Sequence, residues 1–204
     1  MKQLALLILI VFFVSCKQSG KPQTQDPVTK ETPDPATDSA QIRKVIMGFY
    51  NWYAANYRQF DAYHLYTGIK TKEGPPFRIS WEEVEKYQRF IKTSVPQLGE
   101  EFISNQRIFF KQCDSAFKVD MNDDLPYGFD YDWYTNSQED PQYLLDAITK
   151  GVNWWNIEVK GNNGIVEING YPDQKGKQDP TTFISLAMKK ENNKWTIAGI
   201  GKNQ

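Results

Sequence analysis

The sequence predicts an α+β fold in which N-terminal helices pack on a C-terminal curved antiparallel β-sheet. Two observations support this class. Between residues 42 and 115, apolar side chains recur at the three- to four-residue spacing of amphipathic helices. After residue 155, apolar and polar side chains alternate in runs separated by turn residues, which is the pattern of β-hairpins. Because helices come first and strands last, the α+β class is favoured over an alternating α/β arrangement.

The chain begins with a segment typical of an exported lipoprotein. The unbroken apolar run over residues 4–14 is shorter than the roughly 20 residues that a membrane-spanning helix needs, and it has the layout of a secretory signal peptide. It ends in FVSC, which resembles the bacterial lipobox, although Phe13 stands where leucine is usual. The resemblance implies a signal peptide of residues 1–15, cleavage before Cys16 and lipid attachment to the Cys16 thiol. An ordinary signal peptide with an incidental Cys16 is the alternative.

Residues 16–38 are predicted to be the lipidated cysteine and a disordered tether. The segment after Cys16 is rich in proline and polar residues and lacks aromatic side chains, so it cannot bury a core. Two or more acyl chains would hold the mature protein on a membrane without a spanning helix. Residues 39–204 have the length of one domain.

The first two helices have recognisable starts. The apolar stripe of the first runs from Ile42 to about Tyr57, and a capping box that begins at Asp38 precedes it. The second is predicted over residues 81–92, because a capping box begins at Ser80 and a hydrophobic staple brackets it.

The third helix is predicted over about residues 97–115. Its apolar stripe is expected to bury Phe102, Phe109 and Cys113, the last as an inert core thiol. Residues 68–76, with Gly-Pro-Pro at their end, are expected to break the chain between the first two helices.

Residues 118–134 contain the highest density of acidic and aromatic side chains in the chain. Asp120, Asn122 and Asp124 match the first three ligand positions of a calcium loop. The match then stops, since Leu125 replaces the glycine and Tyr131 replaces the final glutamate. The alternative to a calcium site is a solvated loop whose carboxylates form Asx-turns.

The end of this stretch alternates aromatic and acidic residues. In a strand, Phe129, Tyr131 and Trp133 would lie on one face, and Asp130 and Asp132 on the other. The aromatic face is expected to fill the core of a half-buried strand. Alternatively, it forms a pocket wall or a partner surface, with Trp133 as the anchor.

A short helix and four strands complete the chain. Asp140 as N-cap, Pro141 at the first helical position and Gly151 at the end predict the helix over residues 141–150. The strands are predicted over residues 155–160, 165–169, 183–190 and 195–200.

This layout resembles a family of uncharacterised bacterial lipoproteins, domain-of-unknown-function family 3828. The resemblance rests on FYNWY near the start of the domain, on DLPYGFDYDWYTNSQED, and on the two closing hairpins. It implies a cone-shaped fold like that of nuclear transport factor 2 and a location in the cell envelope. The family carries no established activity, and the wider fold hosts isomerases, dehydratases and non-catalytic binding modules. Because fold does not fix function, the resemblance transfers no mechanism.

Composition argues against several classes of protein. A net charge of −1 argues against a general nucleic-acid binder. A lipidated Cys16 leaves Cys113 without a partner for a disulfide, and the single histidine, His64, argues against a zinc site of His and Cys. No cofactor is predicted.

Three functions remain open from the sequence. The leading one is a non-catalytic module that binds an envelope protein or a small-molecule ligand. The second is a small-molecule isomerase or hydrolase that uses an Asp and a Tyr in the cone, and the third is an immunity or inhibitor protein. Lys17, rather than aspartate, follows Cys16, which favours the outer membrane, and no acidic run follows that would indicate surface export. The periplasmic face of that membrane is therefore the expected location.

Overall fold

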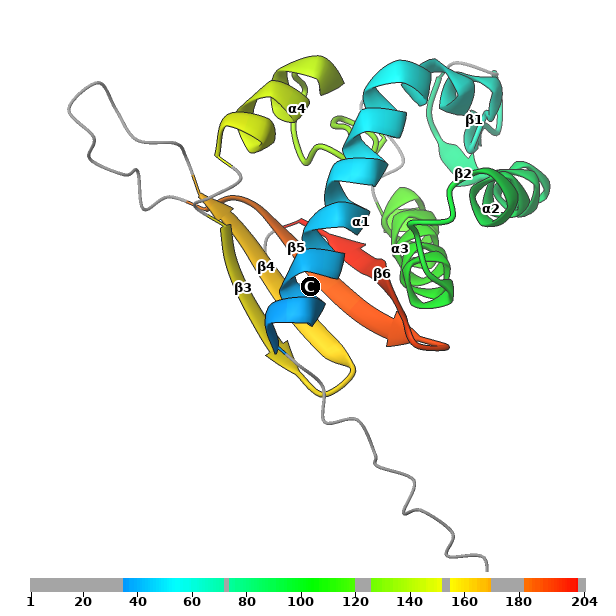
Figure 1. The fold of residues 1–204 in the computed structure, drawn as a ribbon. Helices are drawn as coiled ribbons and strands as arrows, with labels where there is room; N and C mark the ends of the chain where they lie inside the picture. The colour runs from blue at the N-terminus through cyan, green and yellow to red at the C-terminus, as the bar shows by residue number, and fades with distance from the viewer. Residues whose placement is uncertain (1–34, 72–73, 120–125, 152–154, 170–181, 202–204) are drawn as a thin grey trace, which may run out of the picture. The chain divides into compact units, whose positions relative to one another are not determined.

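The computed structural model describes residues 35–71, 74–119, 126–151, 155–169 and 182–201 (Figure 1). These residues contain the helices α1 (Pro35–Asn56), α2 (Trp81–Ser94), α3 (Glu100–Val119) and α4 (Pro141–Lys150). A 3₁₀-helix, η1 (Tyr57–Ala62), continues from α1. The described helices are all too short or too polar to cross a membrane.

The main sheet is a four-stranded antiparallel meander in the order β3-β4-β5-β6. Its strands are β3 (Trp155–Lys160), β4 (Asn163–Asn169), β5 (Thr182–Glu191) and β6 (Lys194–Ile200). The register shifts at two bulges: Phe183 is the extra residue in β5, opposite Ile168 and Asn169, and Ala198 is the extra residue in β6, opposite Ala187 and Met188. Because a bulge bends its strand and increases the local twist, these two irregularities explain why the sheet curves.

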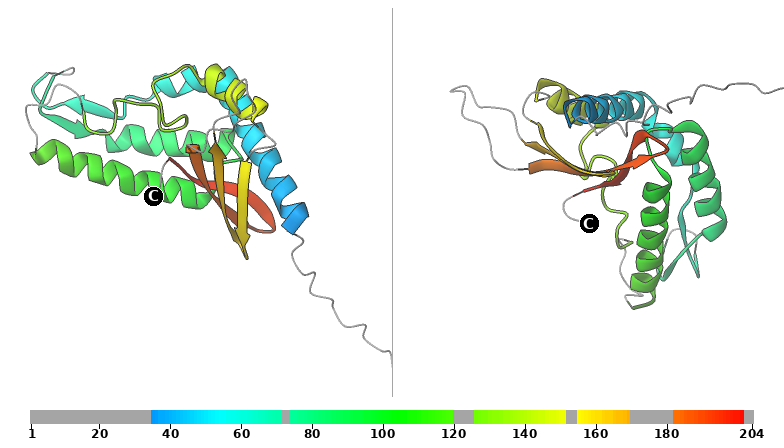
Figure 2. Two further views of the ribbon diagram at one scale, coloured as in Figure 1. Left: turned by 90° about the vertical axis from the view of Figure 1, so that its left-hand side faces the viewer. Right: turned by 60° about the horizontal axis from the view of Figure 1, so that its bottom comes forward.

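Helix α1 lies over one face of this sheet and contacts both outer strands, β3 and β6 (Figures 1 and 2). A β-carbon added at Gly164 would lie 3.4 Å from Ile42 Cδ1 and 3.3 Å from Met188 Cβ, so glycine in β4 permits the close approach of the helix. The core between helix and sheet is apolar on both sides, with Ile46 and Leu186 fully buried. The α+β class and the packing of helices on the sheet are therefore confirmed.

The free edge of β6 is covered by the segment that leads into α3. The Ile197 amide donates to the Gln97 carbonyl (2.8 Å), and the Gly99 amide donates to the Ile197 carbonyl (2.9 Å). Helix α3 then runs away from this edge (Figure 2). This junction places the first turns of α3 beside the end of β6, where the candidate site lies.

Helix α1 begins earlier than the sequence indicated. It includes Pro35 at its first position, where proline is tolerated because that N–H needs no partner within the helix. Asp38 is therefore inside the first turn and does not act as the predicted N-cap. Its carboxylate accepts hydrogen bonds from Lys190 Nζ and Trp195 Nε1, both at 2.8 Å. These bonds connect the start of α1 to the β5–β6 hairpin.

Two other local expectations need correction. Helix α2 begins at Trp81 as predicted, but the Ser80 side chain makes no capping hydrogen bond. In α3, Phe110 is fully buried and Phe109 is only half-buried, whereas Phe102 and Cys113 are buried as expected. In the middle turn of α3, the buried face is therefore centred on Phe110 and not on the predicted Phe109.

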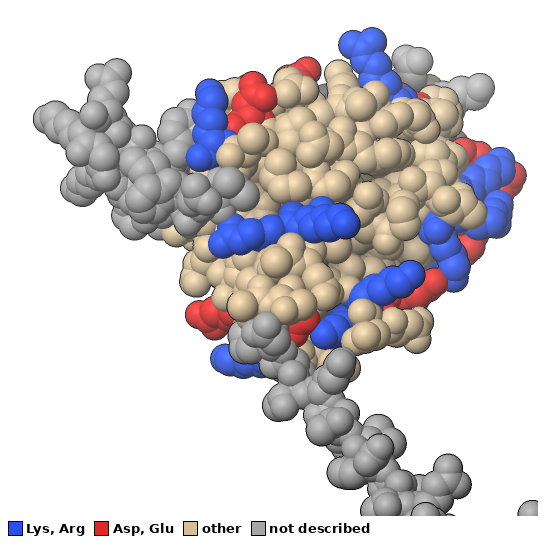
Figure 3. Space-filling view, viewed as in Figure 1, with Lys and Arg blue, Asp and Glu red and all other residues tan. Residues whose placement is uncertain are grey.

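A small hairpin was not predicted from the sequence. Strands β1 (Tyr66–Gly68) and β2 (Phe77–Ile79) pair antiparallel on either side of the expected break. Helix α3 packs against β2. On the face drawn in Figure 3, basic and acidic side chains are interspersed over a largely uncharged surface, in line with the near-neutral net charge.

Candidate functional site

The α3–α4 loop, residues 120–140, contains most of the predicted site residues and is described from Pro126 onward. It does not form the predicted strand; residues 126–140 are turns and bends with one isolated bridge between Asp132 and Ser137. The Trp133 indole donates to the Gly128 carbonyl (2.6 Å), and Nε2 of the Gln138 side chain donates to the Asp130 carbonyl (2.9 Å). These bonds hold the loop in a defined shape without a strand partner.

A tight approach to α3 fixes the start of the described loop. Gly128 has φ +78°, and a β-carbon there would lie 2.6 Å from the Phe109 ring and 3.0 Å from Cys113 Sγ. Only glycine suits both the left-handed backbone and this contact. The Trp133 ring packs edge-to-face against Phe109 and Phe110, with centroids 5.6 and 5.3 Å apart. Trp133 is therefore a half-buried wall of the site, fixed by its neighbours.

Asp130 and Asp132 do not share an exposed face. Asp130 is exposed, whereas the Asp132 carboxylate turns inward. Its Oδ2 accepts from the Tyr53 hydroxyl (2.7 Å), and its Oδ1 accepts from the Tyr134 amide (2.7 Å). Burial raises the pKa of Asp132, and these hydrogen bonds partly offset the rise because they stabilise the ionised form. The turn, rather than a strand, is what directs this carboxylate to Tyr53.

Buried tyrosines form a hydrogen-bonded network beneath the loop. The Tyr50 hydroxyl donates to the Tyr134 carbonyl (2.9 Å), and the hydroxyls of Tyr87 and Tyr134 lie 2.6 Å apart. Gln106 Nε2 donates to the Tyr87 hydroxyl (3.0 Å). Burial raises the pKa of Tyr50, Tyr87 and Tyr134, so these phenols stay neutral at physiological pH.

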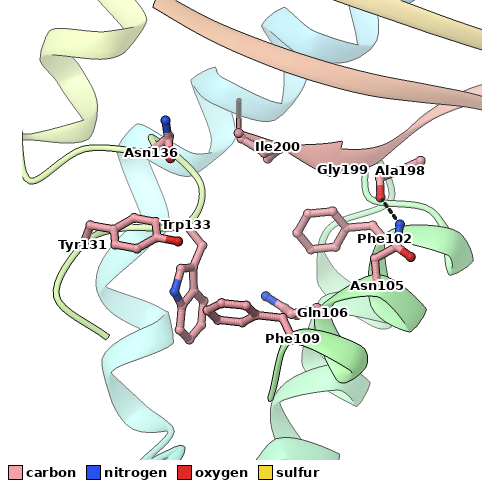
Figure 4. A pocket seen from close by; sticks show the side chains of 11 residues that line it. Phe102, Asn105, Gln106, Phe109, Tyr131, Trp133, Asn136, Ala198, Gly199 and Ile200 are labelled. Atoms are coloured by element: carbon pink, nitrogen blue, oxygen red, sulfur yellow. Dashed lines mark hydrogen bonds between the residues drawn. The ribbon is translucent and has the colours of Figure 1, made fainter. Parts of the chain in front are cut away.

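A cavity of about 250 Å³, here called the α3–β6 cavity, lies between α3, the loop and the end of β6 (Figure 4). Its floor is buried and includes Phe102, Gln106 and Ala198. Its mouth is more exposed and includes Tyr131, whose side chain is 38 % exposed, and Asn136. The remaining lining residues are Asn105, Phe109, Trp133, Gly199, Ile200 and Gly201.

Gln106 lines this cavity, but its unsatisfied acceptor, Oε1, is sealed from solvent and does not face the open space. The residue is 7 % exposed, and while its Nε2 is bonded to Tyr87, its Oε1 has no hydrogen-bond partner among the described residues. Asn105 differs, because its Nδ2 donates to the Ala198 carbonyl at 3.1 Å (Figure 4). A buried polar atom without a partner is unusual in a native protein and needs an explanation.

A broader depression of about 710 Å³, here called the acidic groove, lies on the other side of the same wall. Tyr131 and Trp133 line both concavities. The groove also contains the Tyr53–Asp132 pair and, from the loop and η1, four further acidic residues: Asp61, Asp130, Glu139 and Asp140. The loop is thus a partition between an uncharged cavity and an acidic groove.

The structure places the predicted site residues unevenly. Tyr131, Asp132 and Trp133 meet at this partition, with Asp130 on the groove side. Asp120, Asn122 and Asp124, the calcium candidates, and the lipidation candidate Cys16 all lie outside the described residues. Within the described parts of the chain, no three His, Cys, Asp or Glu side chains are grouped to hold a metal ion.

Sequence reasoning missed Gln106 and the end of β6. Gln106 lies one helical turn from Phe102 and from Phe110, both buried, and a polar residue on an apolar stripe was the signal available. Gly199 and Gly201, at the end of β6, also line the cavity. Cys113 is buried, and burial raises the pKa of its thiol to about 12, which fits an inert core residue.

No known protein family, curated protein or solved structure gave a significant match to the chain. The resemblance to the lipoprotein family therefore stays a prediction, and function must be argued from the site.

Proposed function

We propose that this protein is a lipid-anchored bacterial envelope protein whose folded domain is a non-catalytic binding module. The single observation that carries the proposal is the partition formed by Tyr131 and Trp133, which gives one rigid aromatic wall to two concavities. Binding residues fall disproportionately on loops that a scaffold holds in place. Here the hydrogen bonds of the α3–α4 loop and the packing of Trp133 on α3 supply that scaffold.

The groups at the partition suit binding better than catalysis. The described residues that line the α3–β6 cavity include no Asp, Glu, His, Lys or Arg, and burial raises the pKa of Tyr131, so these residues offer no group that readily exchanges a proton near neutral pH. Asp132, in the groove, already accepts hydrogen bonds at both oxygens from Tyr53 and Tyr134. These hydrogen bonds fix the conformation of the loop, and Asp132 would have to release one of them to transfer a substrate proton.

The anchor and the location complete the proposal. Cys16 carries the lipid, the residues up to the start of α1 form the tether, and the domain faces the periplasm from the outer membrane. The lipobox-like FVSC and Lys17 support this placement. The partner is an envelope protein or a small molecule, and nucleic acid is not expected at a net charge of −1.

Native mass spectrometry tests whether the domain binds through the partition. The full chain in lipid nanodiscs is incubated with an extract of its own cell envelope, washed and analysed for retained mass. We expect a bound species that Trp133→Ala loses and Trp81→Ala keeps, because Trp81 on α2 lines neither concavity. Retention that is the same in both variants, or no retained species, would overturn the proposal.

One observation favours a second candidate, an isomerase that uses the acidic groove. The Tyr53 hydroxyl lies 2.7 Å from Asp132 Oδ2 at the groove, and a raised carboxyl pKa is a common property of catalytic acids and bases. Such an enzyme would exchange hydrogens next to a carbonyl group. Deuterium incorporation into a panel of small ketones in D₂O, present in the wild type and in Asp130→Asn but absent in Asp132→Asn, would favour this candidate over a non-catalytic module.

A further inference from the structure

We propose that the acidic groove binds an arginine-rich segment of a protein partner, whose guanidinium groups lie against the aromatic walls and pair with the exposed carboxylates. This rests on the proposed binding function and names the chemistry of the partner for one of the two concavities. Three features of the groove support it: charge of one sign, aromatic walls, and a guanidinium group of the chain itself that already lies at the edge.

The formal charge of the groove is entirely negative. Its described lining residues include five carboxylates and no Lys, Arg or His, although the whole chain has nearly equal numbers of acidic and basic residues. Among the described residues, no salt bridge involves any of the five. Carboxylates crowded in one concavity attract cationic groups and repel anionic ones. Four of the five are exposed: Asp61, Asp130, Glu139 and Asp140.

The arrangement of these carboxylates suits an organic cation better than a metal ion. In the described ranges of the chain, no three His, Cys, Asp or Glu side chains come together to hold a metal ion. The surface between the carboxylates is instead largely aromatic and includes the half-buried rings of Tyr57, Tyr63 and Trp133. The face of an aromatic ring attracts a cation. Arginine is favoured over lysine, because a guanidinium group is planar and more weakly hydrated than an ammonium group.

Arg58 already makes a contact of this kind at the edge of the groove. Its guanidinium carbon lies 5.8 Å from the centre of the Tyr57 ring, and its Nε donates to the Tyr57 hydroxyl (3.4 Å). This hydrogen bond is the main cause of a raised pKa of Arg58, and the charges of Asp61 and Asp140 add to it. One aromatic wall and two carboxylates of the groove therefore favour a guanidinium group beside them. Arginines of a partner would extend the same pattern across the groove.

The size of the groove favours a chain segment over a single small cation. Its volume of about 710 Å³ is nearly three times the 250 Å³ of the α3–β6 cavity and equals that of about 24 liquid water molecules. One small cation would leave most of the carboxylates without a counter-charge. Several arginines on one segment bind several carboxylates at once, because each contact raises the effective concentration of the next.

Fluorescence anisotropy with the full chain in nanodiscs of zwitterionic phosphatidylcholine tests this inference. The probe is a labelled short peptide of alternating arginine and glycine, and empty nanodiscs give the background. Two matched peptides replace arginine by lysine or by citrulline, which has nearly the shape of arginine without its charge. At about 0.15 M salt we expect the arginine peptide to bind about tenfold more tightly than the citrulline peptide and about threefold more tightly than the lysine peptide.

Matched variants assign the binding to the groove. Asp130 and Glu139 make their hydrogen bonds to described residues through the backbone alone, so Asp130→Asn/Glu139→Gln should fold normally. It should weaken binding of the arginine peptide about tenfold. The control, Asp146→Asn/Glu158→Gln, removes the same charge from exposed positions on α4 and β3 that line neither concavity, and should change affinity less than about twofold. Arg58→Gln should strengthen binding, because it frees the position beside Tyr57.

Several results would overturn the inference. These are no binding of the arginine peptide above the background of empty nanodiscs, equal binding of the citrulline or lysine peptide, and equal weakening in the groove variant and its control. Displacement of the peptide by an equal concentration of methylguanidine would also overturn it, since the groove would then take a small cation. The retained mass from envelope extract tests the binding module separately. A failure here with that mass still retained would reject the arginine-rich partner and leave the module intact.

Discussion

Among the ion pairs of the described residues, the one whose carboxylate should be most costly to remove is that of Asp38, and we expect Asp38→Ala to destabilise the domain strongly. Asp38 is 2 % exposed and holds both Lys190 Nζ and Trp195 Nε1 at 2.8 Å. The alanine variant leaves an ammonium group and an indole N–H without their acceptor. Removing one partner of a buried ion pair costs about 3–5 kcal/mol, because the other charge stays buried and unpaired.

Two features of the structure favour the lower end of that range. The Lys190 side chain is 16 % exposed and can extend towards water, and Asp38 Oδ2 has no hydrogen-bond partner among the described residues. We therefore expect a loss of about 3 kcal/mol in the free energy of unfolding, which lowers the melting temperature by roughly 6–12 °C for a chain of this size. Urea and thermal unfolding followed by circular dichroism measure both quantities.

The control is Glu82→Gln, which also removes a carboxylate from a lysine pair. Glu82 is largely exposed and pairs with Lys86 at 2.9 Å on the surface of α2, so its loss should leave the free energy of unfolding nearly unchanged. A loss in Asp38→Ala no greater than in Glu82→Gln would refute the idea that Asp38 connects α1 to the β5–β6 hairpin.

The pH dependence of the free energy of unfolding tests the same interaction independently. The hydrogen bond from Lys190, and then that from Trp195, lowers the pKa of Asp38 below its ordinary value of 3.8. On acidification the unfolded chain therefore takes up this proton first. The stabilisation is complete above the unfolded pKa and is lost as the pH falls through the lower folded pKa. The stability difference between wild type and Asp38→Asn should be constant near neutral pH and shrink below about pH 4; a difference that grows on acidification would contradict the assignment.

Three further predictions concern the anchor, the helix caps and the core thiol. Cys16→Ser should abolish lipid attachment because a hydroxyl does not replace the thiol, and an unacylated wild-type N-terminus in mass spectra of the membrane fraction would reject the lipoprotein. Asp140→Ala should lower the free energy of unfolding by about 1 kcal/mol, because the Asp140 carboxylate accepts a hydrogen bond from the Gln142 backbone amide (2.8 Å). Ser80→Ala should lower it much less, because the Ser80 side chain makes no capping hydrogen bond. Equal losses in urea unfolding would contradict this prediction. Cys113 should resist alkylation at pH 8 until the domain unfolds, since its thiol is buried with a pKa of about 12, and rapid labelling of the native protein would show that the α3 core is open.

Local signals in the sequence predicted the local structure well. Asp140, Pro141 and Gly151 mark the two ends of α4, and all three occupy the predicted positions. The alternation of Trp155, whose side chain is buried, with the exposed Asn156 predicted β3 in the same way. Each of these residues acts on neighbours within one turn of helix or one strand. The nearby sequence is therefore sufficient to predict the local structure.

Contacts between distant residues could not be predicted in this way. Asp38 has the sequence pattern of a helix cap, but Lys190 and Trp195 bind it from the last hairpin. Asp132 has the pattern of an exposed strand residue, yet the Tyr53 hydroxyl on α1 draws it inward. In both cases a partner far along the chain offers a hydrogen bond that is at least partly buried and that outweighs the local preference.

The candidate site was predicted in part for the same reason. Trp133 and Tyr131 were identified because aromatic residues next to carboxylates stand out in a loop, and both line the partition. Gln106 was overlooked because its importance depends on the tyrosine network above it and on the approach of β6 beside it. Such a polar residue on an apolar stripe deserves to be treated as a site candidate whenever its helix is expected to be buried.

Photo-cross-linking in living cells tests most directly the claim that the partition is where this protein binds. A benzophenone amino acid replaces either Tyr131, at the partition, or Tyr143, which lies on α4, lines neither concavity and is more exposed at 55 % against 38 %. Irradiation followed by mass spectrometry should give a specific adduct from position 131 and none from position 143. Because random collisions favour the more exposed position, equal adducts at both positions, or an adduct at 143 alone, would contradict the account.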